Sequence, residues 1–287
     1  MREKMAVQII VDSASDITQK QAKELGITVI PLTVTFGEES YKDGVTLDHS
    51  GFYDKLIETD VLPVTSQVTP YEYEEYFKKA VDAGDEVLCI TLSSKLSGTC
   101  QSANIAAQEF DGKVIIVDSE NVTVGEHILT EVAVKLRDEG KNAAEIAEVL
   151  NVEKKKIRLI ALLDTLEYLK KGGRINSAVA VAGTLLSIKP VIAVSDGEVV
   201  FNGMARGSKN SNNKLIEYIK KEGGINFTKP FYLAYTGHSR AMLDKYIEDS
   251  RDLYADYTEE LRASTVGCSI GTHIGPGAIC VTFFCND

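Results

Sequence analysis

Regular alternation of strand-like and helix-like segments is the feature of this sequence that most restricts its fold. In the first half, short apolar runs rich in β-branched residues predict strands at residues 7–11, 27–34, 86–91 and 114–117. Amphipathic stretches behind capping residues predict helices after Thr18, Asp48, Thr69 and Ser97, and at residues 128–136 and 143–150. This alternation indicates an α/β fold with a mostly parallel sheet flanked by helices. The fully apolar run 114–117 predicts a strand buried on both faces.

The second half has a different pattern, beyond a charged segment at residues 151–156 that lacks apolar periodicity. We therefore expect two domains, an N-terminal α/β domain at residues 1–155 and a C-terminal α/β domain at residues 156–287. An Asp196-Gly197 hairpin signal predicts antiparallel pairing, and hence a mixed sheet, in the second domain. Its strands are expected at residues 159–163, 190–194, 199–201, 231–235, 261–266 and 278–284, and its helices at residues 164–170 and 208–221 and after Ser239. The nearly uncharged segment 178–186 is predicted to be buried.

Charge and cysteine content exclude several classes of protein. The formal net charge is -11, and the only dense basic run is residues 154–156, so a nucleic-acid groove is not expected. No apolar stretch reaches the roughly 18 residues that a membrane span needs, which predicts a cytoplasmic protein. The five cysteines show no Cys-x-x-Cys spacing, so neither a zinc site nor a disulfide framework is indicated.

Three islands rich in glycine and hydroxyl residues lie at predicted element boundaries, at residues 63–67, 93–99 and 271–277. Hydroxyls and backbone amides at helix starts suit a carboxylate or a phosphate. A helix cap is the simpler explanation for Thr65, Ser66 or Ser97 taken alone, but four hydroxyls in seven residues favour a site around Ser97 and Gly98. In the third island, Gly275 to Gly277 predict a tight turn from which His273 projects.

Other candidate residues have simpler structural explanations. Asp12 and Asp16 follow the first strand, where carboxylates can hold magnesium, but an Asx-turn that caps the next helix is expected instead. His49, His127 and His238 are expected to be structural or solvated. Arg174, on a glycine-rich loop, is equally suited to contact an anion, a partner or solvent. Walker, dinucleotide-binding, zinc-protease and nucleophile-elbow motifs are absent from the sequence, so neither nucleotide binding nor a metal or other cofactor is expected.

The islands and several further segments together resemble the DegV family of fatty-acid-binding proteins, which includes the FakB-type binding subunits of bacterial fatty acid kinase. The matching segments are residues 12–16, 65–67, 93–103, 118–119, 166–175, 188–190 and 271–277. The resemblance covers the whole chain. It implies two α/β domains with a buried lipid tunnel between them that encloses one long-chain fatty acid.

The resemblance also implies residue roles and a partner. Thr65, Ser97 and His273 match the network that holds the fatty acid carboxylate, with Ser66 and Gly98 beside them. Arg174 matches an arginine near the head group, and we expect it to contact the partner together with Arg206. That partner is a separate ATP-dependent fatty acid kinase, so this chain would present substrate and catalyse nothing itself. Contact with a membrane would be transient at most.

Some positions depart from the usual family pattern, namely His127, Cys280 and the segment 205–209, so chain-length preference and choice of partner do not follow from the resemblance. The segment 178–186 is a candidate for part of the tunnel wall. Two other functions stay open from the residues. One is a serine hydrolase or acyltransferase in which Ser97 attacks and His273 acts as base. The other is a phosphotransferase component that binds a sugar or dihydroxyacetone in a small polar pocket.

Overall fold

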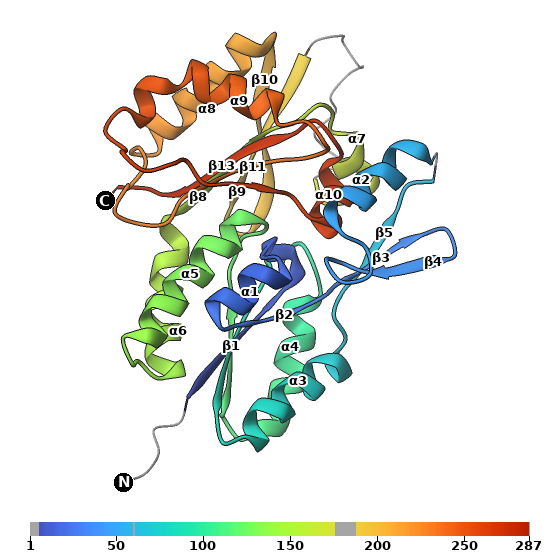
Figure 1. Cartoon of the computed structure of the whole chain (residues 1–287), viewed down its shortest axis with the longest axis vertical. Helices are drawn as coiled ribbons and strands as arrows, with labels where there is room; N and C mark the ends of the chain where they lie inside the picture. The colour runs from blue at the N-terminus through green and yellow to red at the C-terminus, as the bar shows by residue number, and fades with distance from the viewer. Residues whose placement is uncertain (1–5, 60, 176–187, 287) are drawn as a thin grey trace.

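Two large sheets and one small sheet organise the computed structural model, which describes residues 6–59, 61–175 and 188–286 (Figure 1). The first sheet is parallel throughout, in the order β2-β1-β6-β7. Its strands are β1 (Val7–Asp12), β2 (Thr28–Ile30), β6 (Glu86–Thr91) and β7 (Val114–Asp118). The second sheet is mixed, in the order β10-β9-β8-β13-β11-β12. Its strands are β8 (Ile157–Leu162), β9 (Ile188–Ser195), β10 (Glu198–Arg206), β11 (Tyr232–Tyr235), β12 (Ala263–Thr265) and β13 (Ile279–Phe284).

Helices cover both faces of the parallel sheet. They are α1 (Gln19–Leu25), α3 (Pro70–Asp82), α4 (Thr99–Ala107), α5 (Val124–Asp138) and α6 (Ala143–Glu153). Helices α3 and α4 pack together on one face, and α5 and α6 pack together on the other (Figure 1). Capping follows the sequence signals, because Thr18, Thr69 and Asn142 each form a capping box at the start of α1, α3 and α6. The predicted helix starts are confirmed at these caps.

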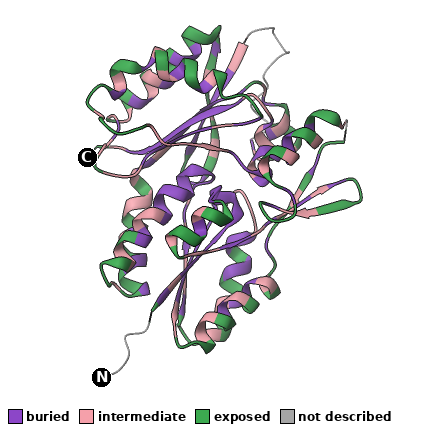
Figure 2. Ribbon diagram, in the orientation of Figure 1, coloured by how far each residue is buried: buried purple, intermediate pink, exposed green. Residues whose placement is uncertain are grey.

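Helix α5 lies between the two large sheets. It contacts β1 and β6 on one side and β8, β11 and β13 on the other. Its first turns, from Val124 to Thr130, are buried throughout, as Figure 2 shows for the centre of the molecule. The opposite face of the mixed sheet is covered by α8 (Ser208–Lys221) and α9 (Ala241–Asp249). Burial on both sides of α5 joins the two sheets into one continuous apolar core.

A third, antiparallel sheet has the order β4-β3-β5 and projects beside the parallel sheet (Figure 1). Its strands are β3 (Thr33–Phe36), β4 (Glu39–Lys42) and β5 (Val64–Ser66). The prediction of a single strand at residues 27–34 is therefore wrong. Pro31 has no N–H to continue a ladder, so the chain leaves the parallel sheet after β2 and enters the small sheet at β3. The Leu32 N–H donates instead to Ser13 Oγ at 3.0 Å.

Short helices complete the structure around the small sheet and the joins between elements. They are α2 (His49–Glu58), α7 (Glu167–Lys171) and α10 (Cys268–Ile274), with 3-10 turns η1 (Ser13–Ser15), η2 (Gln108–Phe110), η3 (Lys154–Lys156) and η4 (Arg251–Tyr254). Helix α7 begins three residues later than the predicted segment 164–170, since Thr165 Oγ1 accepts from the Glu167 N–H before the first turn. The segment 151–156 is helical and leads directly into β8.

The predicted α/β fold, with a parallel N-terminal sheet and a mixed C-terminal sheet, is confirmed. One further detail differs from the sequence-based expectations. Strand β7 is an edge strand, so Ile115 and Ile116 are only half-buried although the run is fully apolar. The segment 178–186 lies outside the described residues, and the domain division at residue 155 stays a prediction. Within the described residues, no helix is both long and apolar enough to cross a bilayer.

Candidate functional site

A cavity of about 340 Å³ lies where the carboxyl ends of the parallel strands meet the small sheet, α7 and α10. Open α/β sheets bind ligands at this edge. Most of its wall is apolar, formed by Ala14, Leu32, Leu92, Leu96, Val122, Leu169, Val199, Ile270 and Ile274. The polar lining residues are Thr65, Ser66, Gln67, Ser97, Gly98, Arg174, Ser269 and His273. The cavity therefore combines apolar walls with several polar lining residues.

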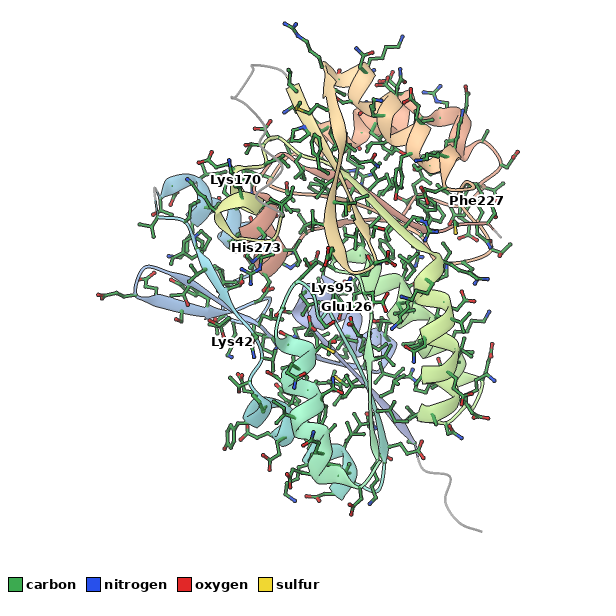
Figure 3. The ribbon with its side chains drawn as sticks, turned by 180° about the vertical axis from the view of Figure 1, so that it is seen from behind. Lys42, Lys95, Glu126, Lys170, Phe227 and His273 are labelled. Atoms are coloured by element: carbon green, nitrogen blue, oxygen red, sulfur yellow. The ribbon has the colours of Figure 1, made fainter. Side chains whose placement is uncertain are left out.

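Thr65 and His273 meet at the cavity, although 208 positions separate them in the sequence. The β5 strand places Thr65 opposite Val34 of β3, and α10 carries His273. The Thr65 Oγ1 and His273 Nε2 atoms are 2.9 Å apart and hydrogen-bonded. Figure 3 shows His273 between the two halves of the molecule, near Lys170 of α7. Two of the predicted residues thus form one hydrogen-bonded pair.

The His273 ring is neutral at physiological pH. Burial lowers its pKa from 6.5 to about 4, and the positive charge of Arg174 adds to this effect. The buried Nδ1 atom has no hydrogen-bond partner within the described part of the chain. It lies against Gly172, where a Cβ atom would be only 2.3 Å from it. His273 is therefore a polar but uncharged member of the site.

Ser97 and Gly98 lie in the loop that leads into α4. Gly98 is the N-cap residue and makes no side-chain cap, while Ser97 Oγ accepts from the Thr99 N–H at 3.2 Å and bonds to Thr99 Oγ1 at 2.9 Å. A Cβ atom on Gly98 would lie 2.0 Å from Oε1 of Gln67. The missing side chain of Gly98 thus lets the Gln67 amide cross the loop beside the cavity, where Gln67 also donates to Ser102 Oγ at 2.8 Å.

The two predicted arginines occupy different places. Arg174 lines the cavity, and its guanidinium donates to the carbonyls of Leu96 at 3.2 Å and Gly172 at 2.5 Å. No carboxylate pairs with it among residues 6–59, 61–175 and 188–286. Arg206 is exposed at the end of β10 and is not one of the described residues that line the cavity. The structure therefore brings Thr65, Ser66, Ser97, Gly98, His273 and Arg174 to one cavity but leaves Arg206 outside it.

The first four residues of the third island are helical, which corrects the prediction that His273 projects from a tight turn. Residues from Cys268 to Ile274 form α10, so His273 lies on a helix, and the chain turns after it, where Gly275 (φ 71°) and Gly277 (φ 75°) both have positive φ. Two buried carboxylates hold its start. Asp16 accepts from the Gly267 N–H at 2.8 Å, and Asp43 accepts from the N–H groups of Cys268 and Ser269 at 3.1 and 3.0 Å. Such long-range capping cannot be seen in a local sequence window.

Gln67 and Ser269 are lining residues that were not predicted as site residues. Gln67 lies in the first island, so its position beside Thr65 was an available signal. Ser269 gave no signal, because the stretch before Gly271 was not assigned to any helix. Helical periodicity places Ser269, Ile270, His273 and Ile274 on one side of α10, facing the cavity.

The hypothesis of a serine hydrolase or acyltransferase does not fit this geometry. His273 Nε2 bonds to Thr65, Ser97 Oγ bonds to Thr99, and no hydrogen bond joins Ser97 to His273 in the described chain. No carboxylate orients the Nδ1 atom of His273 there either.

Asp12 makes the expected Asx-turn by accepting from the Ala14 N–H at 3.0 Å. No group of three or more metal-binding side chains occurs among the described residues.

The family-atypical positions lie away from the cavity. His127 is buried on α5 and stacks on Tyr232 with ring centroids 4.6 Å apart. Cys280 is buried in β13, between Ala161 and Ala234 of the neighbouring strands. Neither is a described lining residue, so the structure gives them no direct contact with the cavity contents.

Comparisons with known proteins agree with the fold described above. A family model described as DegV matches residues 6–286. A DegV domain-containing protein of Caldanaerobacter subterraneus is 36% identical over 279 residues, which cover 96% of this chain and 98% of that protein. A DegV family protein from Thermus thermophilus, described by its fatty acid binding, superposes with a TM-score of 0.86 at 30% identity and covers 98% of this chain and 100% of its own. A stearic acid-binding protein from Eubacterium ventriosum gives 0.83 at 25% identity, with 96% and 97% covered.

Proposed function

The chain belongs to the DegV family, and on this premise we propose that it binds one long-chain fatty acid in the cavity described above. Thr65 and Ser97 donate to the carboxylate, and His273 takes part through its hydrogen bond to Thr65. Ser66 and Gly98 lie beside them. The acyl chain packs against the apolar walls. The observation that carries this proposal is the combination of those walls with the hydrogen-bonded pair of Thr65 and His273 in the same cavity.

The physical chemistry of the cavity supports a fatty acid better than a sugar. Each buried CH₂ group contributes about 0.8 kcal/mol, which a polar ligand cannot gain from apolar walls. A carboxylate in the same cavity needs donors, because burying it unpaired is costly. The hydroxyl groups of Thr65 and Ser97, which line the cavity, supply them. The phosphotransferase hypothesis requires a small polar pocket, which would have fewer apolar wall residues than this cavity.

We further propose that this protein presents its fatty acid to a separate ATP-dependent kinase, which phosphorylates the carboxylate. The division of labour is supported by the absence of a phosphate-binding loop motif from the sequence. Arg174 is suited to the head-group side of that contact, since it is half-buried at the cavity with its guanidinium held by two carbonyls. Arg206 is exposed and is proposed only as a partner contact.

Mass spectrometry of an organic extract of the purified protein tests the binding proposal. One fatty acid per chain is the expected result. Ser97→Ala and Thr65→Val should each lower affinity for added stearic acid by about 1–3 kcal/mol, because the carboxylate loses a donor. Thr35→Val is the matched control, since its hydroxyl bonds to Ser40 on the small sheet. Undiminished affinity in both site variants would refute the assigned carboxylate contacts.

The kinase proposal has a separate test. Arg174→Ala should keep most of the fatty acid affinity and lower acyl phosphate formation when the protein is mixed with the kinase and ATP. Lys171→Ala serves as control, because Lys171 is exposed and pairs with Glu167 on the same helix. Normal acyl phosphate formation by Arg174→Ala would remove Arg174 from the partner contact.

A further inference from the structure

Ser269 carries a buried hydroxyl that no group in the described part of the chain pairs with. The residue is only 2% exposed, and its Oγ atom has no hydrogen-bond partner among the described residues. The same side chain lines the cavity. Buried hydroxyls are normally hydrogen-bonded, so a buried one without a partner calls for an explanation.

Local structure does not provide that explanation. A serine or threonine within a helix often donates to the carbonyl four residues earlier. Thr272, on the same helix, does so by bonding to the Cys268 carbonyl at 2.9 Å. Ser269 makes no such bond among the described residues, and it lines the cavity together with Ile270 and His273 of the same helix.

Hydrogen bonds hold the backbone of Ser269 in place, so α10 is not free to rotate and carry the Ser269 side chain away from the cavity. Its N–H donates to Asp43 Oδ2 at 3.0 Å, and the preceding N–H donates to Asp43 Oδ1 at 3.1 Å. The backbone donors at the start of α10 are thereby taken by protein carboxylates. Of the polar groups of Ser269 that could reach a ligand, the hydroxyl is thus the one without a partner among the described residues.

We propose that Ser269 is a further ligand-binding residue whose hydroxyl bonds to an oxygen atom near the polar end of the bound fatty acid. This inference rests on the proposed function. Ser269 precedes His273 by four residues, so the two side chains lie roughly 6 Å apart on one helix face. That spacing suits either the carboxylate itself or a hydroxyl group on a carbon close to it. The shared chemistry is a ligand oxygen that reaches one helical turn from His273.

Titration calorimetry with stearic acid and with its β-hydroxy derivative tests the proposal and separates the two sources of oxygen. Ser269→Ala should bind stearic acid about tenfold more weakly if the carboxylate is the partner. A loss confined to the β-hydroxy acid assigns the ligand hydroxyl instead, and also supports the proposal. Unchanged affinity for both acids would overturn it.

Thermal unfolding of the ligand-free protein excludes a merely structural role. Ser269→Ala removes an unpaired group, so its unfolding temperature should match that of the wild type. Thr272→Val is the matched control, because it removes a hydroxyl that is bonded within the helix. A ligand-free Ser269→Ala protein that is destabilised as much as Thr272→Val would overturn the proposal. A wild-type protein that binds neither acid would refute the proposed function and this inference together. If the wild type binds both acids and Ser269→Ala binds them equally well, this inference alone is refuted.

Discussion

The protonation of His273 determines how Thr65 can act on a ligand. The ring is neutral, so only one of its nitrogens carries a proton. Nδ1 is buried without a partner among residues 6–59, 61–175 and 188–286, and an unpaired lone pair there is less costly than an unpaired N–H. We therefore assign the proton to Nε2, which donates to Thr65 Oγ1. The hydroxyl proton of Thr65 is then available to a carboxylate, and the histidine orients the donor rather than supplying a charge.

Gly172 sets the position of the His273 ring, and its replacement tests the assignment. In Gly172→Ala the added Cβ would lie 2.3 Å from His273 Nδ1. The ring must move, which separates Nε2 from Thr65, while Gly172 itself has an ordinary φ of −73° that alanine tolerates. We expect stearic acid to bind roughly five- to tenfold more weakly, with the fold retained. Lys171→Ala, one residue away, should bind normally, and equal affinity of both variants would contradict the role of the ring position.

Buried histidines also give the stability of the protein a defined pH dependence. Burial lowers the pKa of His127 to about 3, well below its unfolded value of 6.5. Its contribution to stability is thus complete above pH 6.5 and is lost as the pH falls toward 3, because only the unfolded state takes up the proton. Asp12 acts in the opposite direction, since burial raises its pKa from 3.8 to about 7 and the folded state takes up a proton first. Comparison with a variant is needed to separate the two effects.

His127→Phe isolates the histidine effect while keeping a ring against Tyr232. The stability of the wild type relative to this variant should fall by up to about 1.4 kcal/mol for each pH unit below 6.5. Urea unfolding between pH 7 and pH 5 measures the difference. His238→Gln, at an exposed residue, is the control. A difference that stays constant over this range would show that His127 is not held neutral in the folded protein.

At the scale of elements, α10 is the helix that carries His273 and Ser269 to the cavity. It is only one to two turns long, and a helix this short is not stable by itself. Asp16 and Asp43 hold its first N–H groups from segments more than 200 residues earlier in the chain. Burial raises the pKa of Asp16 well above its ordinary value, and the bond donated by Thr123 partly offsets this effect. The helix that carries His273 and Ser269 is thus positioned by the N-terminal half of the protein.

Asp43→Ala should lower both the stability of the protein and its fatty acid affinity, because Asp43 holds the start of α10. It leaves the N–H groups of Cys268 and Ser269 and the hydroxyl of Ser13 without their acceptor. We expect a loss of roughly 2–4 kcal/mol in the free energy of unfolding, together with weaker fatty acid binding. Asn142→Ala removes the cap of α6 away from the cavity, so it should cost about 1 kcal/mol and leave binding unchanged. Normal fatty acid affinity in a folded Asp43→Ala protein would show that α10 does not depend on this cap.

Elements were predictable from sequence where their signals are local. The capping boxes of α1 and α3 and the Asp196-Gly197 turn between β9 and β10 all lie within a few residues of the elements they define. Prediction failed where groups distant in the sequence determine the local structure. The α10 helix has no side-chain cap of its own, and the separation of β2 from β3 depends on a new partner for the Leu32 N–H as much as on Pro31.

At the scale of the whole molecule, the candidate site was more predictable in composition than in geometry. The hydroxyl and glycine islands identified Thr65, Ser97 and His273, and the structure brings all three to one cavity. Their mutual contacts depend on tertiary packing, so the Thr65–His273 bond and the cavity face of α10 were not predictable. Arg206 shows the converse, because its place in the sequence gave no indication that β10 ends away from the cavity.

The cavity walls come from both large sheets, since Leu92 follows β6 and Val199 belongs to β10. A ligand that fills it should therefore stabilise the whole molecule in one transition. At a free stearic acid concentration about a hundred times Kd, the expected gain is about 2.7 kcal/mol, or roughly 5–10 °C in the unfolding temperature. Calorimetry of delipidated protein with and without stearic acid measures it, and stearyl alcohol, which lacks the carboxylate, should give a smaller gain. If the unfolding temperature of fully delipidated protein does not rise with saturating stearic acid, the fatty acid does not bind the folded state, and a cavity shared by both sheets must have another occupant.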